Sequence, residues 1–477
     1  MNDRYATYAS PLDSRYASAA MRELFGAQRK FSTWRRLWLA LAEAQHALGM
    51  DISADQLRQM ADHLDDIDFA KAEEYERQLR HDVMAHIYAY GDAAPAARPI
   101  IHLGATSQYV NDNTDLILMR EGMGLLIGTL ANVIDALASF AKQYRLLPCL
   151  AFTHFQPAQL TTVGKRAAMW CNDFVMDLRE LERRQDELEF LGVKGATGTQ
   201  ASFLALLGGD HEKVTRLDAM VAEKMGFSRL CRVPGQTYSR KIDAAVAATL
   251  AGIGATVHKF CNDLRLLAHL KEVEEPFGSA QVGSSAMPYK RNPMRCERAT
   301  GLARFLMDLA ASPLHTAAEQ WLERTLDDSA NKRLAMPELF LATDAILLIC
   351  LNVSQGLAVY PATIAAHVTE ELPFMATENI LMAAVQAGGD RQDLHERLRR
   401  HSQAAAEQVK AHGRPNDLLD RIKNDAAFDA VDVDELMDPA TFVGRAPQQV
   451  EEFLAADVAP IRQKYSHLLG QKSELKV

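Results

Sequence analysis

The sequence predicts an all-α protein built around a bundle of unusually long helices. Three segments, residues 115–145, 161–191 and 240–273, each run for more than 30 residues without a proline, whereas a globular helix averages about 11–12 residues. Glycine (26) and proline (17) are less frequent than average in the 477 residues, so few positions interrupt regular structure. A chain of this length should divide into two or three domains.

The third long segment carries a continuous apolar stripe. Its apolar residues recur at every third or fourth position and therefore share one helix face. They are Ile242, Val246, Leu250, Ile253, Val257, Phe260, Leu264, Leu267, Leu270 and Val273. At about 1.5 Å per residue, each long segment spans roughly 45–50 Å, which exceeds the width of a compact domain. The partner helices should therefore include those of other subunits, and we expect an oligomeric bundle.

Two breaks divide the chain into three expected domains. Residues 91–99 (GDAAPAARP) interrupt the chain before the first long helix, and we place a boundary near Thr106. The second boundary lies near Val359, where the string Val359-Tyr360-Pro361 interrupts an apolar helical run. The expected domains are an N-terminal helical domain (1–106), a central long-helix bundle (107–359) and a C-terminal helical domain (360–477).

Charge and cysteine usage exclude several classes of protein. Lysine plus arginine (52) against aspartate plus glutamate (62) gives a formal net charge of -10, so the molecule repels polyanions and we expect no nucleic-acid partner. Any anion site must be a local cluster of cations. The six cysteines are scattered without a CxxC pair, which is typical of reduced thiols in a cytoplasmic protein. The apolar run at residues 345–353 is short, so we expect no membrane insertion.

A long loop separates the third long helix from the next helix. The third helix is expected to end near Glu274-Glu275-Pro276, and Asn292-Pro293 has the form of an N-cap followed by the first helical residue. The intervening residues, 276–292, form a loop of roughly sixteen residues, and loops of this length in helical proteins usually act as lids or binding loops. A flexible polar linker is the alternative.

The string from Gly283 to Pro293 (GSSAMPYKRNP) resembles the signature of the fumarase/aspartase superfamily, whose members are helical lyases that eliminate fumarate from succinyl compounds. Four further strings follow the family order and resemble the adenylosuccinate lyase family in particular: residues 80–86 (RHDVMAH), 103–107 (LGATS), 153–159 (THFQPAQ) and 324–329 (RTLDDS). The resemblance covers nearly the whole chain. Cys296, where the related string often has serine, and Gly278-Ser279 are small departures. We call residues 276–292 the signature loop.

The resemblance implies a three-domain fumarase/aspartase-like fold whose central bundle is shared in a homotetramer. It also implies that each active site is assembled from more than one subunit. The implied substrates are small nucleotides: adenylosuccinate, cleaved to AMP and fumarate, and the succinylated imidazole carboxamide ribotide of purine biosynthesis. No metal or organic cofactor is implied.

The resemblance assigns the base of this elimination to Ser284. A hydroxyl is a poor base unless its alkoxide is stabilised, and Lys290, the backbone amides of the loop and the following helix start could supply positive potential. Lys290 is expected to hold a substrate carboxylate as negative charge develops. The structural alternatives are a turn serine and a solvated lysine.

His154 is the expected acid, because an unperturbed histidine pKa of about 6.5 permits proton donation near neutral pH. It lies in a short non-helical stretch between Pro148 and Pro157. A structural histidine is the alternative, and His81 is the competing candidate, which the resemblance assigns instead to substrate binding. His81 and His86 are five residues apart, which does not fit a helical zinc pair.

A substrate with a phosphate and two carboxylates requires several cations and hydrogen-bond donors. The resemblance implies the following substrate-binding residues: Arg15, Tyr16, Arg80, His81, Asp82, Thr106, Ser107, Gln236, Lys290, Asn292, Arg298, Arg324, Ser329 and Arg333. Ser329 and Arg333 are four residues apart and should share a helix face. The alternative for Arg324 is an ion pair with Asp328 on a solvated helix.

Two other motif interpretations fail on spacing. Residues 192–198 (GVKGATG) lack the second glycine and the GK[ST] ending of a phosphate-binding loop. Residues 111–115 lack the glycine and closing glutamate of a calcium loop, so helix capping explains residues 111–115 better.

Two functional alternatives remain: argininosuccinate lyase, which shares a similar signature but needs no phosphate site, and a non-catalytic structural relative. The presence of Ser284, His154 and Lys290 argues against the latter.

Overall fold

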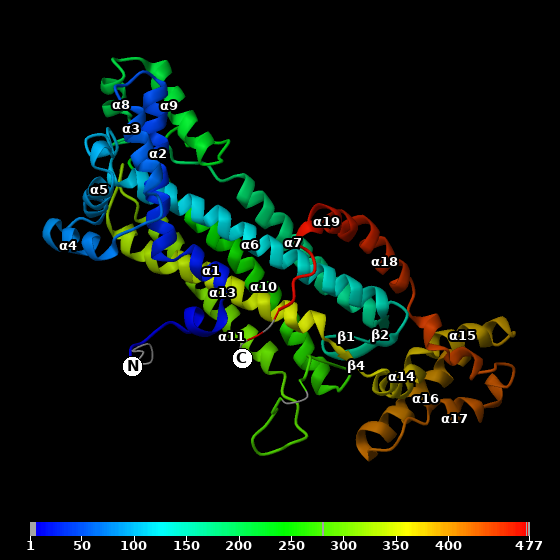
Figure 1. The fold of residues 1–477 in the computed structure, drawn as a ribbon. Helices are drawn as coiled ribbons and strands as arrows, with labels where there is room; N and C mark the ends of the chain where they lie inside the picture. Colours follow the sequence, from blue (N-terminus) through cyan, green and yellow to red (C-terminus); the bar gives the residue numbers. More distant parts are fainter. Residues whose placement is uncertain (1–5, 279–280, 474, 476–477) are drawn as a thin grey trace.

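The computed structural model describes residues 6–278, 281–473 and 475. The helices of a central bundle run side by side along the length of the molecule (Figure 1). They are α6 (Ser107–Gln143), α7 (Val163–Asp186), α10 (Lys241–His269), α11 (Met294–Leu309) and α13 (Asp327–Gln355). Helix α6 packs against α7 and α13, and α10 packs against α7, α11 and α13. The all-α prediction, with a bundle of long helices at its centre, is confirmed.

The apolar stripe of α10 lies in the bundle core. Every stripe position from Val246 to Leu267 is buried, so the periodicity identified the packed face correctly. The helix ends at His269, earlier in the chain than the predicted end near Glu274. Lys271 takes a left-handed φ of 60°, which ends the helix and turns the chain so that Val273 enters a strand.

The other two long helices also begin at different residues from those predicted. Helix α6 begins at Ser107 rather than near Asp115, so residues 111–115 lie inside the helix and do not cap it. Helix α7 begins at Val163 rather than at Thr161, because Thr162 is its N-cap and its Oγ1 accepts a hydrogen bond from the Lys165 N–H at 3.0 Å.

A second set of helices covers one end of the bundle (Figure 1). They are α1 (Ala19–Leu24), α2 (Ala27–Ala47), α3 (Ala54–Asp62), α4 (Phe69–Leu79), α5 (Asp82–Ala93), α8 (Ala201–Leu206) and α9 (His211–Lys224). Trp34, Trp38 and Tyr90 are fully buried here, and the ring of His86 stacks on Phe31 with ring centroids 3.7 Å apart. These residues belong to the same hydrophobic core as the bundle.

A second group of helices lies at the other end (Figure 1). It comprises α14 (Pro361–Met375), α15 (Thr377–Gln386), α16 (Arg391–His412) and α17 (Leu418–Lys423), and the chain then returns along α6 and α7 through α18 (Ala446–Phe453) and α19 (Ala459–Lys464). A separate hydrophobic core runs from Ala376 to Val433, whereas Ile364 and Leu372 of α14 pack into the bundle core. The division into three domains at the predicted boundaries stays a prediction.

Two small antiparallel sheets connect these parts. Strands β1 (Pro148–Thr153) and β2 (Gln156–Thr162) form a hairpin between α6 and α7, and β3 (Val273–Glu274) pairs with β4 (Ala358–Val359). The second pairing joins the chain that leaves α10 to the chain that leaves α13. It therefore fixes where the signature loop begins.

Helices α6, α10 and α13 are long and apolar enough to cross a membrane, judged by length and composition alone. In this fold their apolar residues pack against one another and against the neighbouring helices. The bundle core therefore buries much of their apolar surface, with half of the most apolar stretch of α10 left outside it.

Candidate active site

The turn between α4 and α5 presents three of the predicted substrate-binding residues. Arg80, at the end of α4, takes a left-handed φ of 54°, and His81 is the N-cap of α5, where its Nδ1 accepts a hydrogen bond from the Met84 N–H at 3.3 Å. Both side chains are exposed. An Asp82 carboxylate oxygen lies 2.9 Å from Nη2 of Arg333 on α13. The turn and the first part of α13 thus share one polar surface.

A second group of predicted residues lies where α6 and α13 begin. Thr106 is the N-cap of α6 and Ser107 its first residue. Nη1 of Arg324, which precedes α13, donates a hydrogen bond to Oε1 of Gln236 at 2.6 Å. With the Gln108 amide oriented so that its oxygen faces the guanidinium, that oxygen also accepts from Nη1 of Arg324 at 2.8 Å. Two amides therefore orient this arginine.

Ser329 and Arg333 lie one helical turn apart near the start of α13, as their spacing predicts. The alternative for Arg324, an exposed helix pair with Asp328, is wrong. Arg324 precedes the helix, and the Asp328 carboxylate is buried and accepts a hydrogen bond from Nε of Arg240 at 2.6 Å.

A buried ion network lies beside these residues and was missed by the sequence analysis. Nη2 of Arg240 lies 3.0 Å from Asp112, and Nζ of Lys332 lies 3.2 Å from Asp112 and 2.7 Å from Asp115. With Asp328, these groups join α6, the start of α10 and α13. The sequence signal for this network was the presence of two aspartates, Asp112 and Asp115, within a largely apolar helix.

The charges of this network depend on one another. Burial raises the pKa of Asp112, but the charges of Lys332 and Arg240 lower it more, so this pKa lies below its usual range. Burial lowers the pKa of Lys332, but its acidic neighbours raise it above its usual value. Burial also raises the pKa of Asp243, which accepts a hydrogen bond from the Tyr238 hydroxyl at 2.6 Å. Opposite charges nearby thus stabilise the ionised forms of Asp112 and Lys332 against the cost of burial.

The signature loop presents Ser284 and Lys290 between α10 and α11. Oγ of Ser284 accepts hydrogen bonds from the N–H groups of Met287, at 3.1 Å, and Ala286, at 3.4 Å. Backbone donors directed at this oxygen would stabilise negative charge on it. Lys290 is exposed. Residues 279–280 of the loop, which include the departure at Ser279, lie outside the described residues.

Asn292 does not cap α11, in contrast to the sequence prediction. The Glu275 carboxylate accepts hydrogen bonds from the first free N–H groups of that helix, those of Arg295 at 3.0 Å and Cys296 at 2.9 Å. Because these donors are already satisfied, the Asn292 amide is available to the loop, and its Nδ2 donates to the Gly283 carbonyl at 2.7 Å. This contact closes the loop across its base.

His154 lies at the tip of the β1–β2 hairpin, which confirms that its surroundings are not helical. His154 and Phe155 take φ angles of 53° and 56°, as the two central residues of a tight hairpin turn require. Both side chains are exposed, and Phe155 keeps 54% of its surface accessible. The turn therefore presents both side chains to the surroundings of the chain.

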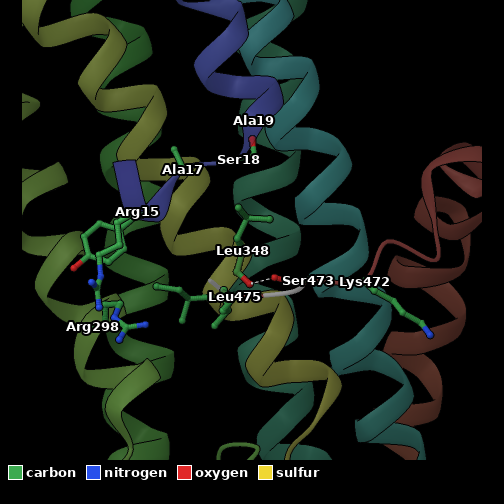
Figure 2. A pocket seen from close by; sticks show the side chains of 11 residues that line it. Arg15, Ala17, Ser18, Ala19, Arg298, Leu348, Lys472, Ser473 and Leu475 are labelled. Atoms are coloured by element: carbon green, nitrogen blue, oxygen red, sulfur yellow. Dashed lines mark hydrogen bonds between the residues drawn. The ribbon is translucent and has the colours of Figure 1, made fainter. Parts of the chain in front are cut away.

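Arg15, Tyr16 and Arg298 line one cavity of about 370 Å³. Arg15 and Tyr16 belong to a single π-helical turn (Leu12–Tyr16), and Arg298 lies in the second turn of α11. The guanidinium carbons of both arginines lie 5.9 Å from the centroid of the Tyr16 ring. Figure 2 shows Arg15 and Arg298 together on one side of the cavity, whereas Lys472 points away from them. Two of the predicted substrate-binding arginines thus lie close together, and their role in anion binding stays a prediction.

The long helices keep these groups apart within one chain. Helix α6 has 37 residues and therefore spans roughly 55 Å. Thr106 and Ser107 lie at its first end, whereas the hairpin that carries His154 follows its second end (Figure 1). The signature loop likewise begins at β3, beside the C-terminal end of α13, whereas Arg333 lies near the N-terminal end.

The glycine-rich residues 192–198 support the site and do not bind a phosphate in the manner of a nucleotide-binding loop. Lys194 is buried and forms an ion pair with Asp218, so its ammonium group is not available to a ligand. The Ala196 carbonyl accepts a hydrogen bond from Nε2 of Gln236 at 3.0 Å. Among residues 6–278, 281–473 and 475, no group of three or more His, Cys, Asp or Glu side chains could hold a metal ion.

Comparisons with known proteins agree with this architecture. Residues 21–307 match the family model described as "Lyase", and residues 373–453 match "Adenylosuccinate lyase C-terminus". The chain is 52% identical over 473 residues to adenylosuccinate lyase from Saccharomyces cerevisiae (98% of each chain covered). It is 48% identical over 479 residues to adenylosuccinate lyase from Schistosoma mansoni (100% of each chain covered).

Two solved structures resemble the fold at low sequence identity. One is 3-carboxy-cis,cis-muconate lactonizing enzyme from Pseudomonas putida (TM-score 0.80, 21% identity, covering 95% of this chain and 99% of that one). The other is a fumarate lyase from Mesorhizobium (TM-score 0.78, 23% identity, covering 94% and 100%). At this identity the two structures establish the fold alone.

The buried ion network generates a prediction about stability. Arg240→Ala leaves the Asp112 and Asp328 carboxylates buried without their shared partner, and should lower the free energy of unfolding by about 3–5 kcal/mol. Denaturant unfolding at fixed protein concentration measures this change. Arg399→Ala, which breaks an exposed pair with Glu396, is the control and should leave the transition in place. Equal transitions for the two variants would contradict the assigned role of the network.

Proposed function

The chain belongs to the adenylosuccinate lyase family, and we infer that it catalyses the elimination of fumarate from adenylosuccinate, which leaves AMP. The single observation that carries this inference is 52% sequence identity to an adenylosuccinate lyase over 98% of both chains. We also propose that it removes fumarate from the succinylated aminoimidazole carboxamide ribotide, which presents the same succinyl-amine bond to the site. Both reactions belong to purine biosynthesis, and neither step calls for a cofactor.

The reaction needs a base and an acid on opposite sides of the bond that breaks. The base takes a proton from the succinyl carbon beside a carboxylate, the electron pair of that C–H bond forms the double bond of fumarate, and the C–N bond breaks. The acid then protonates the departing nitrogen. Proton transfer by positioned groups of this kind usually contributes a factor of about 10²–10⁴.

We propose Ser284 as the base and His154 as the acid. Two backbone N–H groups directed at Oγ of Ser284 support the first assignment, because they favour the alkoxide form. The exposed Lys290 is proposed to bind the substrate carboxylate on which negative charge develops. The exposed imidazole of His154, at the tip of a hairpin, supports the second assignment, because it can reach a ligand held by another surface.

The substrate anions are proposed to bind two cation clusters. One cluster consists of Arg15 and Arg298 around the Tyr16 ring, and the other consists of Arg324 and Arg333 at the start of α13. In a chain whose formal net charge is -10, such clusters create the local positive potential that a phosphate and two carboxylates require. Arg80, His81, Asp82, Thr106, Ser107, Gln236, Asn292 and Ser329 are proposed to orient the nucleotide.

We propose a homotetramer in which each active site draws residues from more than one subunit. The roughly 55 Å span of α6 supports this, because it separates His154 from the residues at positions 80–82 and 106–107 within one chain. Large apolar side chains exposed on the long helices also support it, since subunit contacts would bury them. They are Met169 and Met176 on α7, Leu266 on α10, Phe305 on α11 and Leu334 on α13.

The location in the cell and the domain organisation are also proposals. All six cysteines are free and buried, which supports a reducing compartment, and we propose the cytoplasm without a membrane or nucleic-acid partner. We retain the three proposed domains, 1–106, 107–359 and 360–477.

The proposed activity is tested by fumarate release from purified substrates. Adenylosuccinate should yield fumarate and AMP, and argininosuccinate should yield none, because only the former offers a phosphate to the cation clusters. Release of fumarate from argininosuccinate but not from adenylosuccinate would show that the proposed substrate is wrong. Release from neither would favour the non-catalytic alternative.

Ser284→Ala should lower kcat by about 10²–10⁴-fold while the protein keeps its thermal midpoint, because a partly exposed loop hydroxyl contributes little to packing. Single-turnover measurements with adenylosuccinate check this expectation. Ser285→Ala, which changes the adjacent exposed serine, is the matched control and should retain most of the activity. A Ser284→Ala variant that keeps more than about a tenth of wild-type kcat would contradict the assignment of the base.

Shared active sites predict complementation between inactive variants. If Ser284 and His154 of one site come from different chains, mixing Ser284→Ala with His154→Ala and exchanging subunits should restore about a quarter of wild-type activity, because random assembly gives that share of sites both intact residues. Each variant taken alone through the same exchange is the control. Hybrid tetramers confirmed by native mass spectrometry, but without fumarate release, would show that one chain supplies both residues.

A further inference from the structure

The base of the signature loop meets the C-terminal helices at a small junction. Strands β3 and β4 pair Val273 with Val359 and Glu274 with Ala358, and the Tyr360 N–H donates to the Glu272 carbonyl at 2.9 Å. Tyr360 is also the N-cap residue of α14. The chain leaving α10 is therefore joined to α14 immediately before the signature loop begins.

The Tyr360 side chain joins the two ends of the loop. Its hydroxyl donates to Oε2 of Glu274 at 2.8 Å and accepts from Nη1 of Arg291 at 3.2 Å. The same Nη1 lies 3.6 Å from the Glu274 carboxylate, and the Arg291 guanidinium carbon lies 5.2 Å from the centroid of the Phe277 ring. Thus Glu274 before the loop, Phe277 at its start and Arg291 at its end meet around one tyrosine hydroxyl.

This contact extends through the chain to the reactive residues. Arg291 lies between Lys290 and Asn292, and Nδ2 of Asn292 donates to the Gly283 carbonyl, directly before Ser284. Holding Arg291 therefore sets the positions of both Lys290 and Ser284. A Cβ atom at Gly283 would lie 2.1 Å from the Lys290 carbonyl, so the two sides of the loop also touch directly at this point.

We propose that Tyr360 and Glu274 are positioning residues for the reaction: they hold the signature loop so that Ser284 and Lys290 reach the substrate. This inference rests on the proposed function. An exposed arginine pair alone contributes little order, but Glu274 and Tyr360 are half-buried and supply a hydrogen-bonded bridge with defined geometry. Small displacements of reacting groups lower the rate steeply, whereas the nucleotide is proposed to bind the separate arginine clusters, so the effect should fall on kcat.

Tyr360→Phe tests the proposal because it removes only the bridging hydroxyl. We expect kcat for fumarate release from adenylosuccinate to fall about 10-fold or more, with KM within about twofold of wild type. Glu274→Gln removes the charge that attracts Arg291 and should act in the same direction. Because the two residues serve one contact, the double variant should lose less than the product of the single losses.

His367→Asn is the matched control at the same junction. Nδ1 of His367, on α14, lies 2.9 Å from Oε1 of the buried Glu272, so this variant weakens the junction without touching Arg291. It should lower the thermal midpoint and leave kcat unchanged. If His367→Asn lowers kcat as much as Tyr360→Phe does, the junction acts through stability and the positioning role is wrong.

Hydrogen–deuterium exchange supplies a readout that does not depend on activity. Peptides covering residues 281–293 should exchange faster in Tyr360→Phe and Glu274→Gln than in wild type and His367→Asn. Unchanged exchange together with unchanged kcat in both variants overturns this inference, while fumarate release by the wild type leaves the proposed function standing. A wild type without fumarate release overturns the proposed function instead. In that case the exchange measurement alone shows whether Tyr360 and Glu274 anchor the loop.

Discussion

The buried pairing of Arg240 with Asp112 and Asp328 is the constraint on which the arrangement of the long helices depends. Three helices contribute charges to it, and Arg240 is the shared partner, so its loss would take an ion pair from both Asp112 and Asp328 in the interior. Apolar stripes alone would tolerate sliding of one long helix along another, because hydrophobic contact is not directional. The ion network removes that freedom and fixes the heights at which α6, α10 and α13 begin.

The relative positions of these helices also place the arginines of the candidate site. Arg324 and Arg333 flank the buried network on α13 and in the segment before it, and the amides of Gln108 and Gln236 orient Arg324 from either side. The glycine-rich residues 192–198 support Gln236 in turn, with their lysine neutralised by Asp218. A rigid interior thus carries a surface of oriented cations, which suits a substrate with several anionic groups.

Helix length then determines how such a site can be completed. Because the helices of the bundle extend over tens of ångströms, the residues at their two ends serve different surfaces of one chain. The hairpin with His154 and the signature loop with Ser284 belong to one end, and the α4–α5 turn belongs to the other (Figure 1). Association of copies through the exposed apolar faces of the long helices is the simplest way to bring these ends together, and it is the basis of the proposed tetramer.

The sequence by itself determined the all-α class, the bundle and its family, because helical periodicity and loop strings are local properties of the chain. The apolar face of α10, the non-helical position of His154 and the shared face of Ser329 and Arg333 could all be predicted from spacing. Only the tertiary structure decided the contacts between distant segments. Glu275 replaces Asn292 at the start of α11, Asp328 pairs with Arg240 instead of Arg324, and Tyr360 joins the two ends of the signature loop. Spacing along the chain does not predict which residues these contacts join. The contacts form only once the long helices and the short β3–β4 pairing have brought the segments together.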